Sequence, residues 1–209
     1  MRILDDEETR AILHAHGLDR PTGIGFAFPY AARNVLYDWH THPYHQLIYA
    51  AAGPAQIETA QGRHILPQGR AAWIPAGTRH RSLVTDNVGA SLYFAPEAIS
   101  DTSSHVRILV ANPLMREMVL HATRWERGAS ETDSLADSFL RVLALLCDEW
   151  LEQQLNLFLP TTAHPSLRRA MDYALADLAG ATQAGAITHA ALSERSFRRL
   201  FMRETGLTW

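Results

Sequence analysis

The chain has 209 residues, of which 47% are hydrophobic and 20% charged, with 12 Gly and 10 Pro. This composition is ordinary for a globular protein and excludes a disordered, collagen-like or low-complexity chain. The net charge of −3 excludes a protein that coats nucleic acid over its whole surface. The single cysteine, Cys147, excludes a disulfide framework and a Cys-rich zinc site, and it is typical of a reducing compartment.

The first ten residues, MRILDDEETR, are acidic and lack the apolar segment of a secretion signal. Nowhere does the sequence reach the ~18 consecutive apolar residues that a membrane span needs. We therefore expect a cytoplasmic protein. Residues 5–16 are predicted to form a short acidic helix that ends at Gly17.

Between residues 23 and 95 the sequence consists of short apolar segments separated by Gly and Pro. Turn signals recur about every eight to twelve residues, which is typical of a β-sandwich or β-barrel. The segments predicted to be strands include 47–52, 55–59, 63–66, 71–74, 82–84 and 90–94.

Beyond Pro96 the apolar residues follow helical spacing. One helix is predicted to begin at Pro113 and run to about residue 125, and a second is predicted over 133–154. The second helix has a long apolar stripe that could pack on the β region or form a dimer interface. Phe139 and Trp150 on that stripe favour the dimer interface.

Residues 157–166 contain two prolines around polar residues and are predicted to be a linker. Three further helices are predicted after it, over about 166–178, 184–190 and 193–205. The sequence thus predicts three regions: a β-barrel over 1–100, a helical dimerisation or linker region over 101–156, and an all-α region over 164–209.

The last of these helices has the pattern of a DNA-reading element. Ser193 is a good N-cap, Phe197, Leu200 and Phe201 form the face expected to be buried, and Gly206 is expected to end the helix. The arginines point elsewhere on this helix, at positions Arg195, Arg198, Arg199 and Arg203. A short helix, a tight turn and a capped helix of this kind form a helix-turn-helix, whose second helix enters the major groove. The alternative is an ordinary solvated helix face.

The segments HPSLRRAMDYALADL and LSERSFRRLFMRETGLTW resemble the start of the AraC-type DNA-binding domain, over about residues 164–209. This resemblance implies that Arg195, Arg198 and Arg199 contact bases and backbone of double-stranded DNA, with Ser193 as the helix cap. The family joins two such motifs by a long helix. The match stops at Trp209, about where that connecting helix should begin, so we expect only the first motif here.

The segments WHTHPYHQ and GRAAWIPAGTRH give the pattern H-x-H-x3-Q followed by G-x5-P-x-G-x2-H. This pattern resembles the paired motifs of the cupin family, which form small jelly-roll barrels. Ligand-sensing AraC-type regulators have such a barrel before their DNA-binding domain. The resemblances together imply a β + α fold: an N-terminal cupin barrel, then helices and a partial, all-α helix-turn-helix domain.

The cupin-like residues could form a site inside the barrel. Residues two apart on a strand face the same side, so His40, His42 and Gln46 can point inward, with His80 on a neighbouring strand. Three imidazoles and a carboxamide oxygen suit Fe, Mn, Ni or Zn. Gln46 stands where metal-binding cupins usually have Glu, which removes a charge from the ligand set. The same residues could instead line a pocket for an organic ligand, together with Trp73, or close hydrogen bonds within the barrel.

We therefore expect a regulator of transcription rather than an enzyme. It would respond to a small molecule or a divalent metal in the barrel, form a homodimer and bind double-stranded DNA. One alternative is a cupin metalloenzyme such as a dioxygenase or isomerase. The other is a shortened regulator that senses and dimerises but binds DNA poorly, since a single reading motif makes about half of the contacts.

Overall fold

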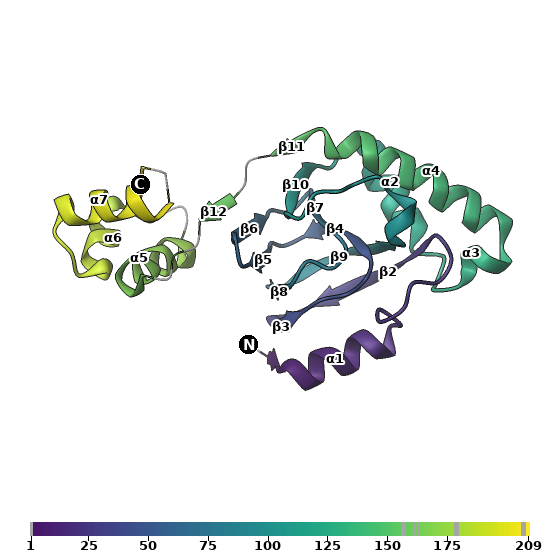
Figure 1. The fold of residues 1–209 in the computed structure, drawn as a ribbon, viewed down its shortest axis with the longest axis horizontal. Helices are drawn as coiled ribbons and strands as arrows, with labels where there is room; N and C mark the ends of the chain where they lie inside the picture. Colours follow the sequence, from purple (N-terminus) through teal and green to yellow (C-terminus); the bar gives the residue numbers. More distant parts are fainter. Residues whose placement is uncertain (1, 156–157, 161, 163, 178–179, 206–207) are drawn as a thin grey trace. The chain divides into compact units, whose positions relative to one another are not determined.

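A computed structural model gives the fold (Figure 1) and describes residues 2–155, 158–160, 162, 164–177, 180–205 and 208–209. The chain divides into two compact units, Met1–Leu159 and Pro160–Trp209. Each unit has hydrophobic clusters of its own.

The first unit is built on two six-stranded sheets, ordered β1-β3-β8-β5-β6-β12 and β11-β10-β7-β4-β9-β2. β1 pairs in parallel with β3, and the pairs among β2 to β11 are antiparallel. This arrangement confirms the predicted cupin-type barrel. The strands are β1 (Arg2–Leu4), β2 (Gly25–Ala32), β3 (Val35–His40), β4 (His45–Ala52), β5 (Ala55–Thr59), β6 (Gly62–Leu66), β7 (Arg70–Ile74), β8 (His80–Val84), β9 (Asn87–Phe94), β10 (Arg107–Val110), β11 (Gln154–Leu155) and β12 (Phe158–Pro160).

The sheet that contains β4 is buried on both faces. Leu47 and Tyr49 belong to a cluster shared with the helices after the barrel, whereas Ile48 and Ala50 belong to a cluster shared with Ile57 of the opposite sheet. Because successive side chains on a strand point to opposite faces, β4 contributes to both cores at once. This explains its nearly continuous run of apolar residues.

A short 3₁₀ turn at Pro96–Ala98 joins β9 to β10, and helices α2 (Pro113–Ala122), α3 (Ala129–Thr132) and α4 (Ser134–Leu151) follow β10. Figure 1 shows α4 running across the sheet of β7 and β10. Trp150 of α4 is 3% exposed within the core shared with that sheet, and the ring of Phe139 lies 4.9 Å from that of Trp125. The apolar stripe of α4 therefore packs largely on its own β region. Cys147 lies in the same core, where burial raises the pKa of its thiol.

Helix α1 (Asp6–Ala15) begins with a capping box, in which Asp5 accepts from two amides of the first turn. It lies beside β3 (Figure 1). Thr9 is buried between them: its hydroxyl donates to the carbonyl of Leu4 and accepts from the amide of Asp38 at 3.2 Å. The predicted acidic helix is confirmed, and the structure adds its position on the edge of the barrel.

The second unit consists of α5 (Pro165–Ala176), α6 (Gln183–Ala190) and α7 (Glu194–Thr205). Phe197 and Phe201 of α7 are buried against α5 and α6, with Leu192 and Leu200 packed beside them. Ala191 turns the chain between α6 and α7 with a φ of 54°. The predicted stop at Gly206 and much of the predicted linker 157–166 lie outside the described residues. None of the helices in the described ranges combines the length and apolar character of a membrane span.

The N-cap of α4 provides a test of this packing. Asp133 accepts from the amides of Leu135 and Ala136 and from the indole of Trp125. We expect Asp133→Ala to lower the free energy of unfolding by about 1–2 kcal/mol, because the helix is then uncapped. Asp137→Ala is the matched control. It removes a first-turn carboxylate and its pair with Arg141 but leaves the cap in place, and should cost about 0.5 kcal/mol or less. Urea unfolding followed by Trp fluorescence measures both, and equal effects of the two variants would contradict the role of the cap.

Candidate functional site

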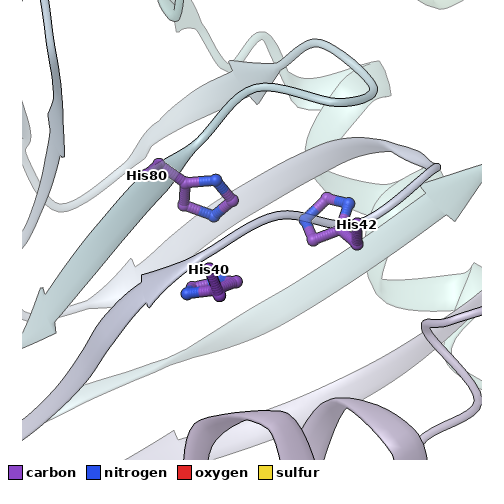
Figure 2. A group of neighbouring side chains, drawn as sticks. All are labelled: His40, His42 and His80. Carbon is purple, nitrogen blue, oxygen red and sulfur yellow. The ribbon is translucent and has the colours of Figure 1, made fainter. Parts of the chain in front are cut away.

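Three histidines converge inside the barrel. His40 ends β3, His42 follows it in the turn before β4, and His80 begins β8, opposite His40 in the β3–β8 pair. The ring centroids of His40 and His80 are 4.2 Å apart, and those of His42 and His80 are 5.3 Å apart. One ring nitrogen from each lies within 4.8 Å of the other two. Figure 2 shows the three rings around a common space.

Each of these rings is oriented by a backbone carbonyl. Nδ1 of His40 lies 2.7 Å from the carbonyl oxygen of Asp38, Nδ1 of His42 lies 3.0 Å from that of Tyr44, and Nδ1 of His80 lies 2.9 Å from that of Thr78. A carbonyl can only accept, so the proton of each neutral ring is assigned to Nδ1. Nε2 is then the unprotonated nitrogen in all three rings, which is how histidines are prepared to bind a metal.

Gln46 is the fourth member of the group. Its amide nitrogen donates to the hydroxyl of Tyr93 at 2.8 Å and to that of Ser91 at 3.3 Å. This turns its Oε1 toward Nε2 of His42, at 3.0 Å. Both of these atoms are acceptors, so in this orientation a cation between them is favoured. The separation suits two ligands of one ion at about 2.1 Å each. Without a cation, the carboxamide of Gln46 can rotate so that its nitrogen takes the place of Oε1 and donates to Nε2 of His42.

The site strongly favours neutral imidazoles. Burial lowers the pKa of His42 from 6.5 to about 4, and the neighbouring His40 contributes to this shift. Burial, together with His40 and His42, lowers the pKa of His80 well below its usual value. Burial also lowers the pKa of His40, partly offset by the carbonyl and carboxylate of Asp38. All three rings are therefore available as metal ligands at neutral pH.

A cavity of about 120 Å³ opens from this group. A single water needs only about 10–15 Å³, so the cavity can hold an organic ligand or several waters. His40, His80 and Gln46 lie in its wall with the hydroxyl-bearing residues Ser82, Ser91, Tyr30, Tyr37 and Tyr93. The rest of the wall is mostly apolar, with Ile48, Ile57 and Val84 from the two sheets and Phe28 from β2.

Part of the wall comes from residues that the sequence did not single out. Ile12, Leu13 and His16 reach the cavity from α1 and the residue after it, and the ring of His16 stacks on Phe28 at 5.0 Å. They are three and four residues apart, which places them on one face of an amphipathic helix. That spacing predicts a buried face, and only the structure shows that the face covers the barrel.

Two aromatic residues of the motif segments lie on the other side of the sheet. The predicted pocket residue Trp73 is 0% exposed in the core shared with α4, and its indole donates to Asp101 at 2.7 Å. It is not among the residues that line the cavity. His45 stacks on Trp73 at 5.2 Å, and its Nδ1 accepts from the amide of Ala76. The predicted site residues that the structure brings together are thus His40, His42, Gln46 and His80.

The predicted DNA-reading residues lie on α7 of the second unit. Ser193 accepts from the amide of Ser196 at 3.3 Å, which caps the helix. The arginines Arg195, Arg198, Arg199 and Arg203 are all exposed. Arg198 pairs with Glu194 at 2.6 Å and Arg203 with Glu204 at 2.9 Å. Among the described residues, Arg195 and Arg199 have no acidic partner, and they lie one turn apart.

The family profile described as the AraC-like ligand binding domain matches residues 27–168, which is most of the barrel and the helices that follow it. The chain belongs to the AraC-type regulators. A curated relative, the HTH-type transcriptional regulator NimR of Escherichia coli (strain K12), is 29% identical over 176 residues, covering 81% of this chain and 62% of NimR. The chain therefore spans less than two thirds of the length of that relative.

Two solved structures match the chain at low sequence identity. A structure of apo ToxT K231A from Vibrio cholerae strain SCE256 matches with a TM-score of 0.48 and 8% identity, covering 91% of this chain and 78% of that one. The AraC-like transcriptional activator CuxR matches with a TM-score of 0.40 and 13% identity, covering 85% and 68%.

The buried histidines predict how stability depends on pH. In the unfolded chain His42 takes up its proton near pH 6.5, but in the folded protein only near pH 4. The unfolded state therefore binds more protons between these values, and the free energy of unfolding falls as pH is lowered from 6.5 to 4. His42 alone accounts for a decrease on the order of 3 kcal/mol. Urea unfolding in EDTA at several pH values measures this slope. A flat profile over this range would contradict buried neutral histidines.

Proposed function

We propose that this protein is a transcription regulator that binds double-stranded DNA with α7 and responds to a ligand or metal held in its barrel. The DNA-binding part of this proposal rests on one observation: α7 has a capped N-terminus and exposed arginines opposite its buried Phe197 and Phe201. A capped recognition helix presents its first turns to base edges in the major groove. Arginine suits that place, because its planar group can pair with O6 and N7 of guanine together.

The individual arginines have different expected roles. Arg195 and Arg199 lie at i and i+4, without an acidic partner among the described residues, so DNA binding breaks no ion pair there. Arg198 must leave Glu194 before it can contact DNA. We assign direct contacts to Arg195 and Arg199 first, and supporting contacts to Arg198 and Arg203.

The sensing part of the proposal rests on the histidine group. The residues that would hold a divalent ion are His40, His42, His80 and Gln46, whose donor atoms suit Fe, Mn, Ni or Zn. A bound ion would provide a Lewis-acidic centre that an effector's oxygen or nitrogen could ligate. The effector would bind in the cavity next to the histidine group.

A cupin metalloenzyme would use the same group of ligands and is the second candidate. The similarity to a curated regulator over 81% of the chain favours the regulator. The two are distinguished by whether substitution of the α7 arginines changes the protein's function, since an enzyme in the barrel has no use for them.

The homodimer is proposed through α4. Leu135, Val142 and Leu145 are 58%, 51% and 69% exposed, and their spacing of seven and three residues places them on one side of the helix. This row faces away from the core that holds Leu140, Leu143 and Cys147. A self-complementary pairing of two such rows would bring two copies of α7 to one DNA site.

The double variant Arg195→Ala/Arg199→Ala tests the DNA-binding proposal. We expect at least tenfold weaker binding to the upstream DNA of the protein's own gene, because each base or phosphate contact contributes about 1–3 kcal/mol. The dependence on salt should also weaken, by about 0.9 in the log–log slope for each phosphate that the variant no longer neutralises. Fluorescence anisotropy against scrambled DNA measures both.

Arg10→Ala/Arg116→Ala is the matched control for this experiment, since it removes the same charge from exposed positions on α1 and α2 of the first unit, away from the α4 row. Wild-type binding by the control and much weaker binding by the α7 variant support the proposal. If the wild type binds no DNA specifically, or both variants behave alike, α7 is not the reading element, and a regulator that senses and dimerises but binds DNA poorly is the better description.

Val142→Asp/Leu145→Asp tests the dimer. We expect the wild type to be dimeric and this variant monomeric in light scattering, because two buried carboxylates would repel across the interface. Val88→Asp, at an equally exposed apolar residue of β9, should remain dimeric. A monomeric wild type would contradict the proposed interface.

A further inference from the structure

The wall of the barrel cavity has an unusual charge balance. Its described residues include no Arg, Asp or Glu, and the chain contains no Lys. Its polar groups are imidazoles, hydroxyls and one carboxamide. Of the acidic residues, Asp38 acts on the His40 ring, but it is not part of the wall. The cavity therefore offers no ionised group of its own to a ligand.

A metal ion changes this balance. Three neutral imidazoles and the neutral Gln46 would leave a divalent ion with both of its positive charges. Burying an uncompensated charge in an apolar cavity is costly, and the cost is removed by an anion bound directly to the ion. A carboxylate ligand from the protein would provide this compensation, but Gln46 occupies the place beside His42 where such a side chain could lie.

We propose that the effector itself completes the charge balance: the cavity binds a small monocarboxylic acid with an apolar body, and it does so together with a divalent metal. This inference rests on the metal site of the proposed function. The carboxylate ligates the ion beside His40 and His80, and the apolar body lies against Ile48, Ile57 and Val84. Metal and acid then bind cooperatively, each raising the affinity for the other by the same factor.

Gln46 is the residue that makes the acid necessary. Its surroundings accept a carboxylate in its place, because the hydroxyls of Tyr93 and Ser91 that now accept from its amide can donate instead. Gln46→Glu thus changes the charge of the site with little change in shape. In this variant the protein provides the negative charge, so the acid no longer increases the affinity for the metal.

The test uses the full 209-residue chain, stripped with EDTA, with Co(II) as the metal and benzoate as the acid. Calorimetry gives the affinities, and the visible absorption of Co(II) reports changes in its ligands. We expect benzoate to tighten Co(II) binding at least tenfold, and Co(II) to tighten benzoate binding by the same factor. Benzamide, the uncharged analogue, should have no such effect.

In Gln46→Glu we expect at least tenfold tighter Co(II) binding without benzoate and little effect of benzoate. Gln56→Glu, on the outward side of β5, is the matched control and should behave as wild type.

Three results would overturn the inference: benzoate binding equally well without metal, Co(II) binding that benzoate does not change, or a Gln46→Glu variant that behaves as wild type. If the wild type does not bind Co(II), the inference fails together with the metal site. The DNA-binding part of the proposed function is judged separately, by the anisotropy of the α7 variants.

Discussion

The sheet of β4, β7 and β9 must be covered on both faces, and the rest of the first unit depends on this constraint. Successive residues of β4 alternate between the core under α4 and the interior of the barrel. His45 and Gln46 show the result at the start of the strand: His45 stacks on Trp73 on the helix side, and Gln46 reaches the histidine group on the cavity side. A shift of one residue in this strand would exchange the two sets, so the pairing of β4 with β7 and β9 fixes the site.

The chemistry of the site is set by the backbone as much as by the side chains. The carbonyls of Asp38, Tyr44 and Thr78 hold the three rings in one tautomer, and the barrel keeps them neutral by excluding water. The carbonyl partners lie two residues away from their histidines, so they come from the local path of the strand ends and need no further element. This is why a short motif can specify a whole group of ligands.

Much of this organisation was predictable from the sequence. The spacing of Gly, Pro and His resembled the cupin motifs, and this resemblance predicted the barrel and the group of His40, His42, Gln46 and His80. The argument from strand periodicity was wrong in detail, because His40 ends β3, His42 lies between the strands and Gln46 is on β4. The capped helix with its arginines was predictable because helix signals act locally. Trp73 could not be placed from the sequence, since an aromatic side chain can be buried on either face of a sheet that is covered on both faces. The contribution of α1 to the cavity was also inaccessible, because it depends on how the helix docks on β3, through a hydrogen bond between Thr9 and Asp38, 29 residues further along the chain.

The position of α1 has a consequence for how such a sensor can diversify. Ile12, Leu13 and His16 contribute to the cavity wall from a segment that takes no part in strand pairing and lies apart from the histidine motifs in the sequence. Substitutions there can reshape the space around a ligand without disturbing the register of the sheets or the core beneath α4. Related proteins could in this way acquire new effectors by varying a few residues of one surface helix, while the barrel and its histidines are inherited unchanged.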